Sequence, residues 1–213
     1  MAVYVVGMSG ASGAPYARRV LQGLLSAGHE VDCILTEAGR KVLEVEESVR
    51  LSGAPEADMP ILRAWAGVAA NAQLRLRDER DVGASVASGS YPVAGMAVVP
   101  CSTGTLARIA NGISSNLLER AADACLKERR RLVLVPRETP LSLVHLRNMV
   151  AVTEAGAVVM PAMPGFYHRP QSVQDMVDFV AARALSLLGV EAPFMKTWKG
   201  APGLVLQTAR EQD

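Results

Sequence analysis

The sequence predicts an α/β protein with a doubly wound parallel sheet in a single domain, residues 1–213. Short runs of β-branched residues alternate with amphipathic helical patterns, as in parallel sheets covered on both faces. The length of 213 residues suits one domain, and 50% of the residues are hydrophobic, which is enough for a sizeable core.

The N-terminal half of the chain predicts three strands and two helices. The strands are expected at residues 3–7, 31–36 and 73–77, and the helices from Pro15 to Gly28 and at 37–48. Pro15 suits the first helical turn, where its missing N–H would have no partner anyway. The core face of the first helix is expected to carry Tyr16, Val20, Leu21, Leu24 and Leu25. Residues 50–72 predict no clear element, because Pro55 and Pro60 interrupt a weak helical pattern.

The C-terminal half continues the alternation. Strands are expected at residues 96–100, 132–136 and 158–161. Helices are expected from the loop at 101–105 to near Gly112, and then at 116–129, 141–155 and 172–188. A loop rich in serine, glycine and charge spans residues 78–95. Residues from about 190 to 213 form a tail, and its sequence after Pro193 predicts no element.

The composition argues against several classes of protein. A net charge of +1 and an aromatic content of 4% disfavour a nucleic-acid partner, which needs clustered positive charge or stacking platforms. No stretch approaches the ~20 apolar residues of a membrane span, and the N-terminal apolar run is too short for a signal peptide. We therefore expect a soluble cytoplasmic protein without nucleic-acid or membrane partners.

The sequence indicates neither a disulfide framework nor a metal site. Cys33, Cys101 and Cys125 lack metal-ligand spacing and indicate reduced thiols. The three histidines are scattered along the chain. The segment Asp78–Asp81 is similar to acidic clusters that hold magnesium–diphosphate, but its spacing differs and a solvated turn is the better interpretation.

Two turns of the predicted sheet suit a phosphate group. Ligands of such sheets bind beyond the carboxyl ends of the strands, where helix N-termini direct free N–H groups outward. Gly7–Gly13 combines glycines with the hydroxyls of Ser9 and Ser12, and Ser102–Thr105 carries further hydroxyls at a helix start. Ordinary turns with capping side chains are the alternative for each. Two such turns in one sheet favour a nucleotide, although the glycine spacing is not that of a dinucleotide fingerprint.

Charged and aromatic residues elsewhere have two interpretations each. Arg120 and Lys127 lie two helical turns apart on one face, which fits an anion site or a solvated stripe. Arg137 and Glu138 follow a strand end, where α/β proteins collect functional groups, or they form a local ion pair. The aromatic turn at residues 165–170 borders a site or packs as a loop.

Several motifs together resemble those of the UbiX/Pad1 flavin prenyltransferase family over nearly the whole chain. The matching segments are Gly10–Ala14 (GASGA), Ala87–Ser90 (ASGS), Pro100–Leu106 (PCSTGTL), Asn116–Asp123 (NLLERAAD), Leu126–Arg130 (LKERR), Pro136–Leu141 (PRETPL) and Pro164–Tyr167 (PGFY). Each segment is modest evidence alone, but their order along the chain is specific.

The resemblance implies a flavodoxin-like Rossmann subunit in a homo-oligomer, a dodecamer in the best-known members, with active sites at subunit contacts. It implies that FMN is bound by Gly10, Ala11, Ser12, Thr36, Ser102, Thr103, Thr105 and Arg137. The second substrate, dimethylallyl phosphate, would be bound by Ser88, Arg120, Lys127, Tyr167 and Arg183. The product is prenylated FMN, which a UbiD-type decarboxylase receives as its cofactor.

The resemblance also implies catalytic roles. Family members join the prenyl C1 to N5 of reduced FMN and close a further ring onto C6. The implied catalytic residues are Ser12, Glu46, Lys127, Arg137 and Glu138. Glu46 would act with Ser12 near flavin N5, while Lys127, Arg183 and Tyr167 would stabilise the departing phosphate without a metal. Glu138 would relay a proton beside that phosphate.

One departure and three rival activities accompany the resemblance. Val82 stands about where some members carry a tryptophan, so the wall of the prenyl pocket is expected to differ. Flavin-dependent cysteine decarboxylases carry Pro-Ala-Ser-Ala-Asn-Thr at Pro100–Thr105 and need a histidine that His29 does not match. The other rivals are a direct aromatic-acid decarboxylase and a flavin carrier, and a carrier would have no use for a second phosphate site.

Overall fold

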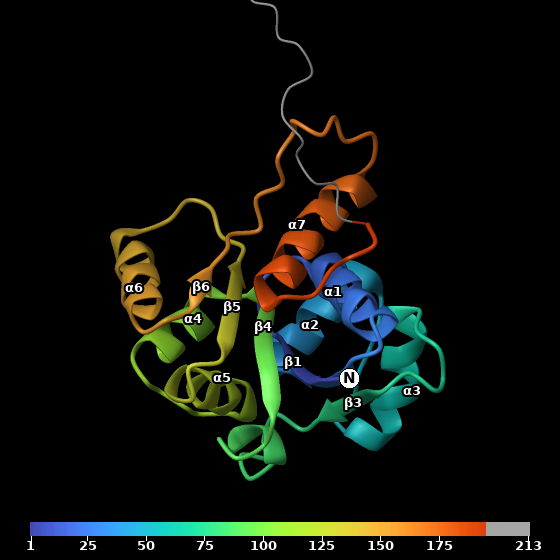
Figure 1. The fold of residues 1–213 in the computed structure, drawn as a ribbon, viewed down its shortest axis with the longest axis horizontal. Helices are drawn as coiled ribbons and strands as arrows, with labels where there is room; N and C mark the ends of the chain where they lie inside the picture. Colours follow the sequence, from blue (N-terminus) through green and yellow to red (C-terminus); the bar gives the residue numbers. More distant parts are fainter. Residues whose placement is uncertain (195–213) are drawn as a thin grey trace, which may run out of the picture.

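The structure is a computed structural model that describes residues 1–194 and contains one central sheet (Figure 1). The sheet has six strands in the order β3-β2-β1-β4-β5-β6, and all neighbouring strands are parallel. The strands are β1 (Val3–Met8), β2 (Glu30–Leu35), β3 (Leu74–Arg77), β4 (Val93–Cys101), β5 (Arg131–Pro136) and β6 (Val158–Val159). The predicted doubly wound parallel sheet is therefore confirmed.

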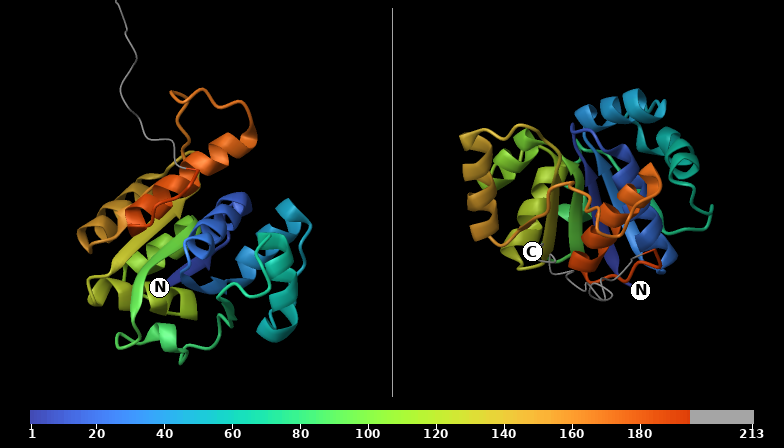
Figure 2. Two further views of the ribbon diagram at one scale, coloured as in Figure 1. Left: turned by 45° about the vertical axis from the view of Figure 1, so that its right-hand side comes forward. Right: turned by 90° about the horizontal axis from the view of Figure 1, so that it is seen from above.

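The direction of the strand order reverses between β1 and β4, and this reversal distributes the helices over two faces. Right-handed crossovers keep successive helices on one face until the order reverses. One face carries α1 (Ala14–Ser26), α2 (Glu37–Glu47) and α3 (Pro55–Ala66), and α7 (Val173–Leu188) returns there to pack along α1 (Figure 2). The other face carries α4 (Thr103–Ala110), α5 (Leu117–Lys127) and α6 (Leu143–Glu154).

The alternation of side chains along β1 builds one core on each face. Tyr4, Val6 and Met8 belong to the cluster under α1 and α7, whereas Val5 belongs to the cluster under α4 and α5. Nearly all of β4 is buried, as expected for a strand at the centre of a sheet with two covered faces. This core fixes the neighbouring carboxyl ends of β1 and β4, where the strand order reverses.

The structure has a helix, α3, where the sequence predicts no clear element. Pro55 lies at its start, where proline is tolerated, but Pro60 lies inside it and removes an internal hydrogen bond. Leu62, Trp65 and Ala66 are buried against the first face, and this tertiary packing outweighs the local penalty.

The other elements agree with the prediction to within three residues at their ends. Strand β4 begins at Val93 and not at Met96, because Val93 pairs with Val3 of β1. A short 3-10 helix at Ser85–Ala87 lies within the predicted loop. The described part of the tail packs on α1, where the guanidinium of Arg19 lies 3.8 Å from the ring centre of Phe194. The predicted tail beyond Phe194 lies outside the described residues.

Candidate active site

The loops after β1 and β4 are joined by the side chain of Ser9. Its hydroxyl donates to the carbonyl of Pro100 at 3.3 Å and accepts the backbone N–H of Ser102 at 2.7 Å. Ser9 is 1% exposed, so both contacts are internal. The sequence suggests a phosphate donor at Ser9, but the structure uses its hydroxyl to hold the two loops together.

The glycines of the first loop let it approach α2 closely. A Cβ atom on Gly10 would lie 2.6 Å from the Cβ of Ala38, and Gly13 has a φ of 129°. A larger residue would push the loop away from α2 or strain the turn that opens α1. The turn is tightened by the N–H of Ala11, which donates to the carbonyl of Ser9 at 2.8 Å.

Glu46 closes this turn from the end of α2. Its carboxylate accepts the backbone N–H groups of Gly13 at 3.0 Å and Ala14 at 2.9 Å, and the Ser12 hydroxyl also bonds to it. These N–H groups form the N-terminus of α1, which attracts negative charge. Burial alone would raise the pKa of Glu46, but these hydrogen bonds and the charge of Arg137 lower it overall. Glu46 is therefore ionised at neutral pH, and the structure brings Ser12 and Glu46 together as expected.

Arg137 and Tyr16 border the same turn. Arg137 follows β5, is exposed, and acts electrostatically on both Tyr16 and Glu46. Burial raises the pKa of Tyr16, the charge of Arg137 opposes this, and that of Glu46 adds to it. Tyr16 packs against the core of the first face, as the sequence predicts, and its half-buried side chain also lies beside the site. In the sequence, only its position three residues after Gly13 links Tyr16 to the site.

The hydroxyl groups expected to bind FMN also cap helices. Thr36 accepts the N–H of Gly39 at 3.0 Å at the start of α2, and Ser102 accepts the N–H of Thr105 at 3.2 Å at the start of α4. Thr36 and Thr105 are 8% and 2% exposed, whereas Ser102 and Thr103 are more open. Capping does not compete with a ligand here, because the first N–H groups of α4 still have no intrahelical acceptor.

Arg108 and Glu119 form an ion pair beside this second loop that the sequence pattern does not indicate. Arg108 is near the end of α4 and Glu119 is in the first turn of α5. Arg108 also donates to the hydroxyl of Thr105 at 3.5 Å. Through this hydrogen bond the ion pair contacts the loop that is expected to bind FMN.

The residues expected to bind the prenyl phosphate fall into two groups. Ser88 precedes β4 and Lys127 ends α5 just before β5, so both lie at the amino edge of the sheet. Arg183 is in α7, on the face opposite to α5, and Tyr167 precedes α7 and packs against it. The ring of Tyr167 is 5.7 Å from that of Phe179, which is one helical turn before Arg183.

The FMN loops lie at the other end of the strands from Ser88 and Lys127. Strand β4 has nine residues, and at ~3.3 Å per residue the two edges are separated by on the order of 30 Å. One subunit therefore does not bring Ser88 or Lys127 together with Ser102. Arg120 and Lys127 share the exposed face of α5, as predicted, with Asp123 between them.

The aromatic turn after β6 packs on α7. His168 stacks on Phe179 with ring centroids 5.1 Å apart, while Phe166 and Tyr167 are 68% and 54% exposed. Glu138, half-buried after β5, accepts the N–H of Thr139 at 3.0 Å. The turn is thus a packed loop that also presents two aromatic side chains to solvent.

The thiols lie in apolar surroundings. Cys33, Cys101 and Cys125 are free and buried, and burial raises the pKa of each to about 12. Neutral thiols of this kind pack as small hydrophobic groups. Within residues 1–194 no group of three or more histidine, cysteine, aspartate or glutamate side chains is arranged to hold a metal ion. None of the helices in that part of the chain is long and apolar enough to cross a membrane.

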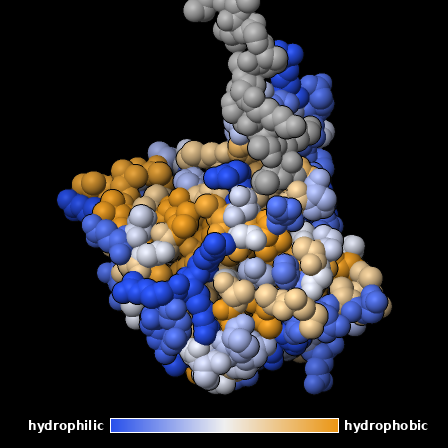
Figure 3. Space-filling model, viewed as in Figure 1, coloured by the Kyte–Doolittle hydropathy of each residue, from blue (hydrophilic) through white to orange (hydrophobic). Residues whose placement is uncertain are grey.

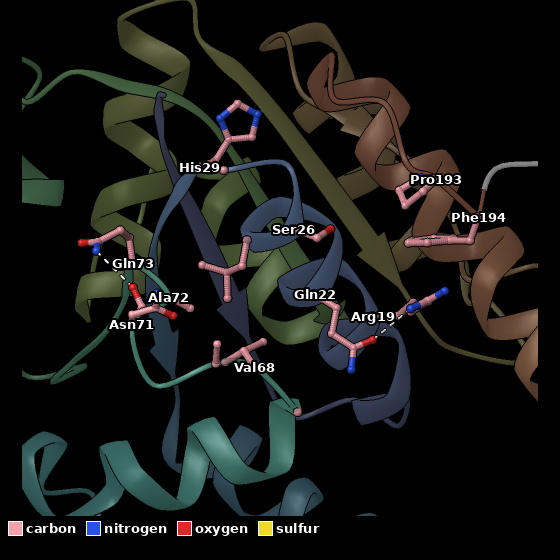
Figure 4. Close-up of a pocket in the computed structure, with 14 residues that line it drawn as sticks. Arg19, Gln22, Ser26, His29, Val68, Asn71, Ala72, Gln73, Pro193 and Phe194 are labelled. Atoms are coloured by element: carbon pink, nitrogen blue, oxygen red, sulfur yellow. Dashed lines mark hydrogen bonds between the residues drawn. The ribbon is translucent and has the colours of Figure 1, made fainter.

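A cavity of about 820 Å³ lies at the amino edge, far from these loops. It is bordered by α1, by the connection from α3 to β3, and by Pro193 and Phe194 (Figure 4). His29 lines it, and burial lowers the pKa of His29 while its Nδ1 has no hydrogen-bond partner among the described residues. Nucleotides bind such sheets at the carboxyl edge, so the flavin site is not assigned to this cavity.

A doubly wound sheet with two glycine- and hydroxyl-rich loops at its switch point defines a nucleotide-binding α/β protein. The model of the family described as Flavoprotein matches residues 2–185. Flavin prenyltransferase UbiX from Synechocystis sp. is 47% identical over 196 residues, which cover 92% of this chain and 95% of that protein. The chain belongs to the Flavoprotein family and, within it, to the UbiX flavin prenyltransferases.

Two solved structures share the whole subunit fold. AnUbiX (PadA1), in complex with FMN and dimethylallyl pyrophosphate, has a TM-score of 0.83 and 38% identity and covers 94% of this chain and 99% of that one. A dodecameric FMN-dependent UbiX-like decarboxylase from Escherichia coli O157:H7 has a TM-score of 0.80 and 38% identity and covers 93% and 100%. The flavodoxin-like fold implied by the motifs is confirmed. Membership in this family favours the prenyltransferase over the cysteine decarboxylase and the flavin carrier.

Proposed function

We propose that this chain transfers the dimethylallyl group of dimethylallyl phosphate to reduced FMN and releases prenylated FMN. The observation that carries the proposal is the pairing of Ser12 with an ionised Glu46 beside Arg137, at the edge where Ser102 caps α4. It is supported by 47% identity to a flavin prenyltransferase and by the FMN and dimethylallyl pyrophosphate in the AnUbiX structure.

The carboxyl edge suits FMN chemically. The N-terminus of α4 offers N–H donors for a phosphate, and Ser102 and Thr103 are accessible there. The turn formed by Gly10, Ala11 and Ser12 allows close approach of a flat ring. Thr36, which caps the neighbouring α2, borders this turn. When bound, reduced FMN supplies the nucleophilic N5 and C6 positions.

Ser12, Glu46 and Arg137 would orient the flavin. Glu46 is a weak base because its pKa is lowered, so it acts by accepting the Ser12 hydroxyl proton in a hydrogen bond. The Ser12 oxygen then presents its remaining lone pairs toward the N–H at flavin N5. Arg137 is exposed beside this pair, where its charge favours electron-rich groups.

Lys127, Arg183 and Tyr167 would hold the phosphate of the prenyl donor, with Ser88 and Arg120 beside it. Two cations and a phenol stabilise the negative charge that develops as the C1–O bond breaks. Joining C1 to N5 releases the N5 proton, which the departed phosphate takes up, and closing the ring moves one proton from C6 to the prenyl double bond. Glu138 would relay these protons beside the phosphate. The same group could accept a diphosphate donor, and an assay with both donors decides between them.

The active site is proposed to form between subunits. Lys127 and Ser88 lie at the opposite edge from Ser102 and Arg137, so a neighbouring subunit must supply one of the two groups. A dodecamer is proposed by likeness to the Escherichia coli structure. Light scattering that showed a stable, FMN-loaded monomer at micromolar concentration would contradict this assembly.

The surface of α6 supports association. Hydrophobic residues gather over α6 on the face shown in Figure 3, and Leu143, Val144, Leu146 and Val150 are each between 46% and 63% exposed. Exposed apolar groups of this extent mark contact surfaces. We further propose a cytoplasmic location and a UbiD-type decarboxylase as the recipient of the product.

The test is anaerobic incubation of the protein with reduced FMN and dimethylallyl phosphate, followed by absorbance and mass measurement of the flavin. We expect a flavin heavier by one C5 prenyl unit. Recovery of unmodified FMN would refute prenyl transfer and leave a flavin carrier. Loss of carbon dioxide from an aromatic acid without a second protein would instead support a direct decarboxylase.

A further inference from the structure

We propose that Arg108, oriented by the buried carboxylate of Glu119, binds the 5′-phosphate of FMN at the N-terminus of α4. The inference rests on the proposed FMN site and adds to it a cation and a positioning residue. Neither residue is among those that the motifs assign to FMN or to the prenyl phosphate.

Glu119 is a fully buried carboxylate whose oxygens both have donors. One oxygen accepts from Nε of Arg108, and the other accepts the backbone N–H of Ser115 at 2.8 Å. Removing a charge from water is strongly unfavourable unless it is paired and hydrogen-bonded, so Glu119 requires Arg108. The reverse does not hold, because the Arg108 side chain is 42% exposed and could remain solvated. Glu119 therefore fixes the orientation of the Arg108 guanidinium, which would otherwise be free to turn in solvent.

The fixed guanidinium reaches the second FMN loop through its other nitrogens. Nη2 donates to the hydroxyl of Thr105 at 3.5 Å, and that hydroxyl also accepts from Ser102 at 3.0 Å. A connected path therefore runs from buried Glu119 through Arg108 and Thr105 to Ser102. Thr105 is only 2% exposed, so it is poorly placed to contact a ligand and instead helps to orient Arg108 and Ser102.

The space beside Gly104 at the start of α4 is open apart from Nη1 of Arg108. A Cβ atom placed on Gly104 would lie 3.6 Å from Nη1, and no other described atom outside its chain neighbours and its own helix backbone would lie within 4 Å. Gly104 is in the first turn of α4, where backbone N–H groups have no intrahelical acceptor. A free N–H of a guanidinium and free N–H groups of a helix N-terminus thus border one accessible volume.

This combination fits a phosphate monoester. A planar guanidinium and a helix N-terminus both favour a phosphate oxygen, and a guanidinium that is already held loses little freedom on binding. FMN and dimethylallyl phosphate both carry such a group. The position beside Ser102 and Thr103, which are expected to bind FMN, favours FMN over the prenyl donor.

The experiment compares the dissociation constants of FMN and riboflavin, which differ only in the phosphate. The variants are Arg108→Gln, Glu119→Gln and the double variant. The double variant replaces the buried ion pair with two neutral amides, so that no unpaired carboxylate threatens folding. Arg50→Gln is the matched control, because Arg50 is 85% exposed and its ion pair is with Glu44 of α2 and not with the second FMN loop.

We expect the ratio of the riboflavin to the FMN dissociation constant to fall about 10-fold or more in Arg108→Gln, as for one lost charge-assisted hydrogen bond. Glu119→Gln should lower this ratio less than Arg108→Gln does. The double variant should lower it no further than Arg108→Gln, because Glu119 acts through Arg108. Riboflavin binding itself and the Arg50→Gln control should not change.

An unchanged ratio in Arg108→Gln and the double variant would overturn the inference, as would equal losses for both flavins, which would indicate a structural role. A raised KM for dimethylallyl phosphate with an unchanged flavin ratio would also overturn it by assigning Arg108 to the other phosphate. If the unmodified protein bound riboflavin as tightly as FMN, the proposed phosphate loop itself would be wrong. The two failures are therefore distinguishable.

Discussion

The carboxylate of Glu46 accepts the backbone N–H of Gly13 at 3.0 Å, so the last turn of α2 closes the glycine turn that opens α1. The two residues lie on successive crossovers of the sheet. Their contact holds Ser12 next to a negative charge at a helix N-terminus, and it links the stability of this turn to the ionisation of one carboxyl group.

Glu46→Gln should lower stability at neutral pH by ~0.5–1 kcal/mol, the low end for a helix cap because Glu46 is exposed and screened by solvent. The folded-state pKa of Glu46 is lowered from its ordinary value of 4.5. The stabilisation is therefore complete above that value and is lost as the pH falls through the folded-state pKa. Urea unfolding at pH 7 and in acid measures this. A gap between parent and variant that stayed constant into acid would contradict the ionic role.

Ser9→Ala should destabilise the protein by about 1–3 kcal/mol, because the N–H of Ser102 loses a buried acceptor. FMN affinity should fall with it, since the two loops are no longer joined. Ser26→Ala is the control, because its hydroxyl bonds a carbonyl at the end of α1. Thermal unfolding and FMN titration test both effects, and a Ser9→Ala protein with unchanged FMN affinity would argue against the link.

Arg183→Ala should retain FMN and lose prenyl transfer by ~10²–10³-fold, as is typical when one electrostatic group is removed from a transition state. Arg183 lies in the second half of α7, which belongs to neither FMN loop. Bound FMN by absorbance and product by mass spectrometry separate the two functions. Loss of FMN as well, or product at the parent rate, would show that the two-site assignment is wrong.

Glu138→Gln should bind both substrates and stall after they meet, because the amide keeps the shape but does not titrate. Its backbone partner, the N–H of Thr139, can still bond the amide oxygen. Single-turnover mixing of the loaded variant with the prenyl donor provides the measurement. If the variant turned over as fast as the parent, Glu138 would have no role in the proton transfer.

Two inactive variants, Lys127→Ala and Arg137→Ala, should restore activity when their subunits are mixed. The two residues belong to opposite edges of one subunit, so a shared site draws them from different copies. Random assembly of equal amounts should give about a quarter of sites with both native residues. Unfolding and refolding the variants together and then assaying turnover tests this. Absence of any recovery in properly reassembled oligomers would contradict a site shared between subunits.

The sequence by itself determined the sheet, most helices and the family. The nearly continuous apolar runs of β1, β4 and β5 are typical of strands buried on both faces of a sheet, so the sequence alone indicates them. The glycine turn before α1 and the hydroxyl-rich start of α4 are local as well. The apolar surroundings of Cys33 and Cys125 followed from the strand and helix in which each lies.

Tertiary structure alone decided the remaining features. Helix α3 forms despite Pro60 because Leu62 and Trp65 are buried by elements distant in sequence. Periodicity assigns a residue to a face of its helix but does not identify its partner across the fold. For that reason the Arg108–Glu119 pair was not predictable, and Ser9 was expected to contact phosphate when it in fact joins two loops. The separation of Lys127 from Arg137 was also not evident from periodicity. The path of the chain through the parallel sheet places each residue at its edge.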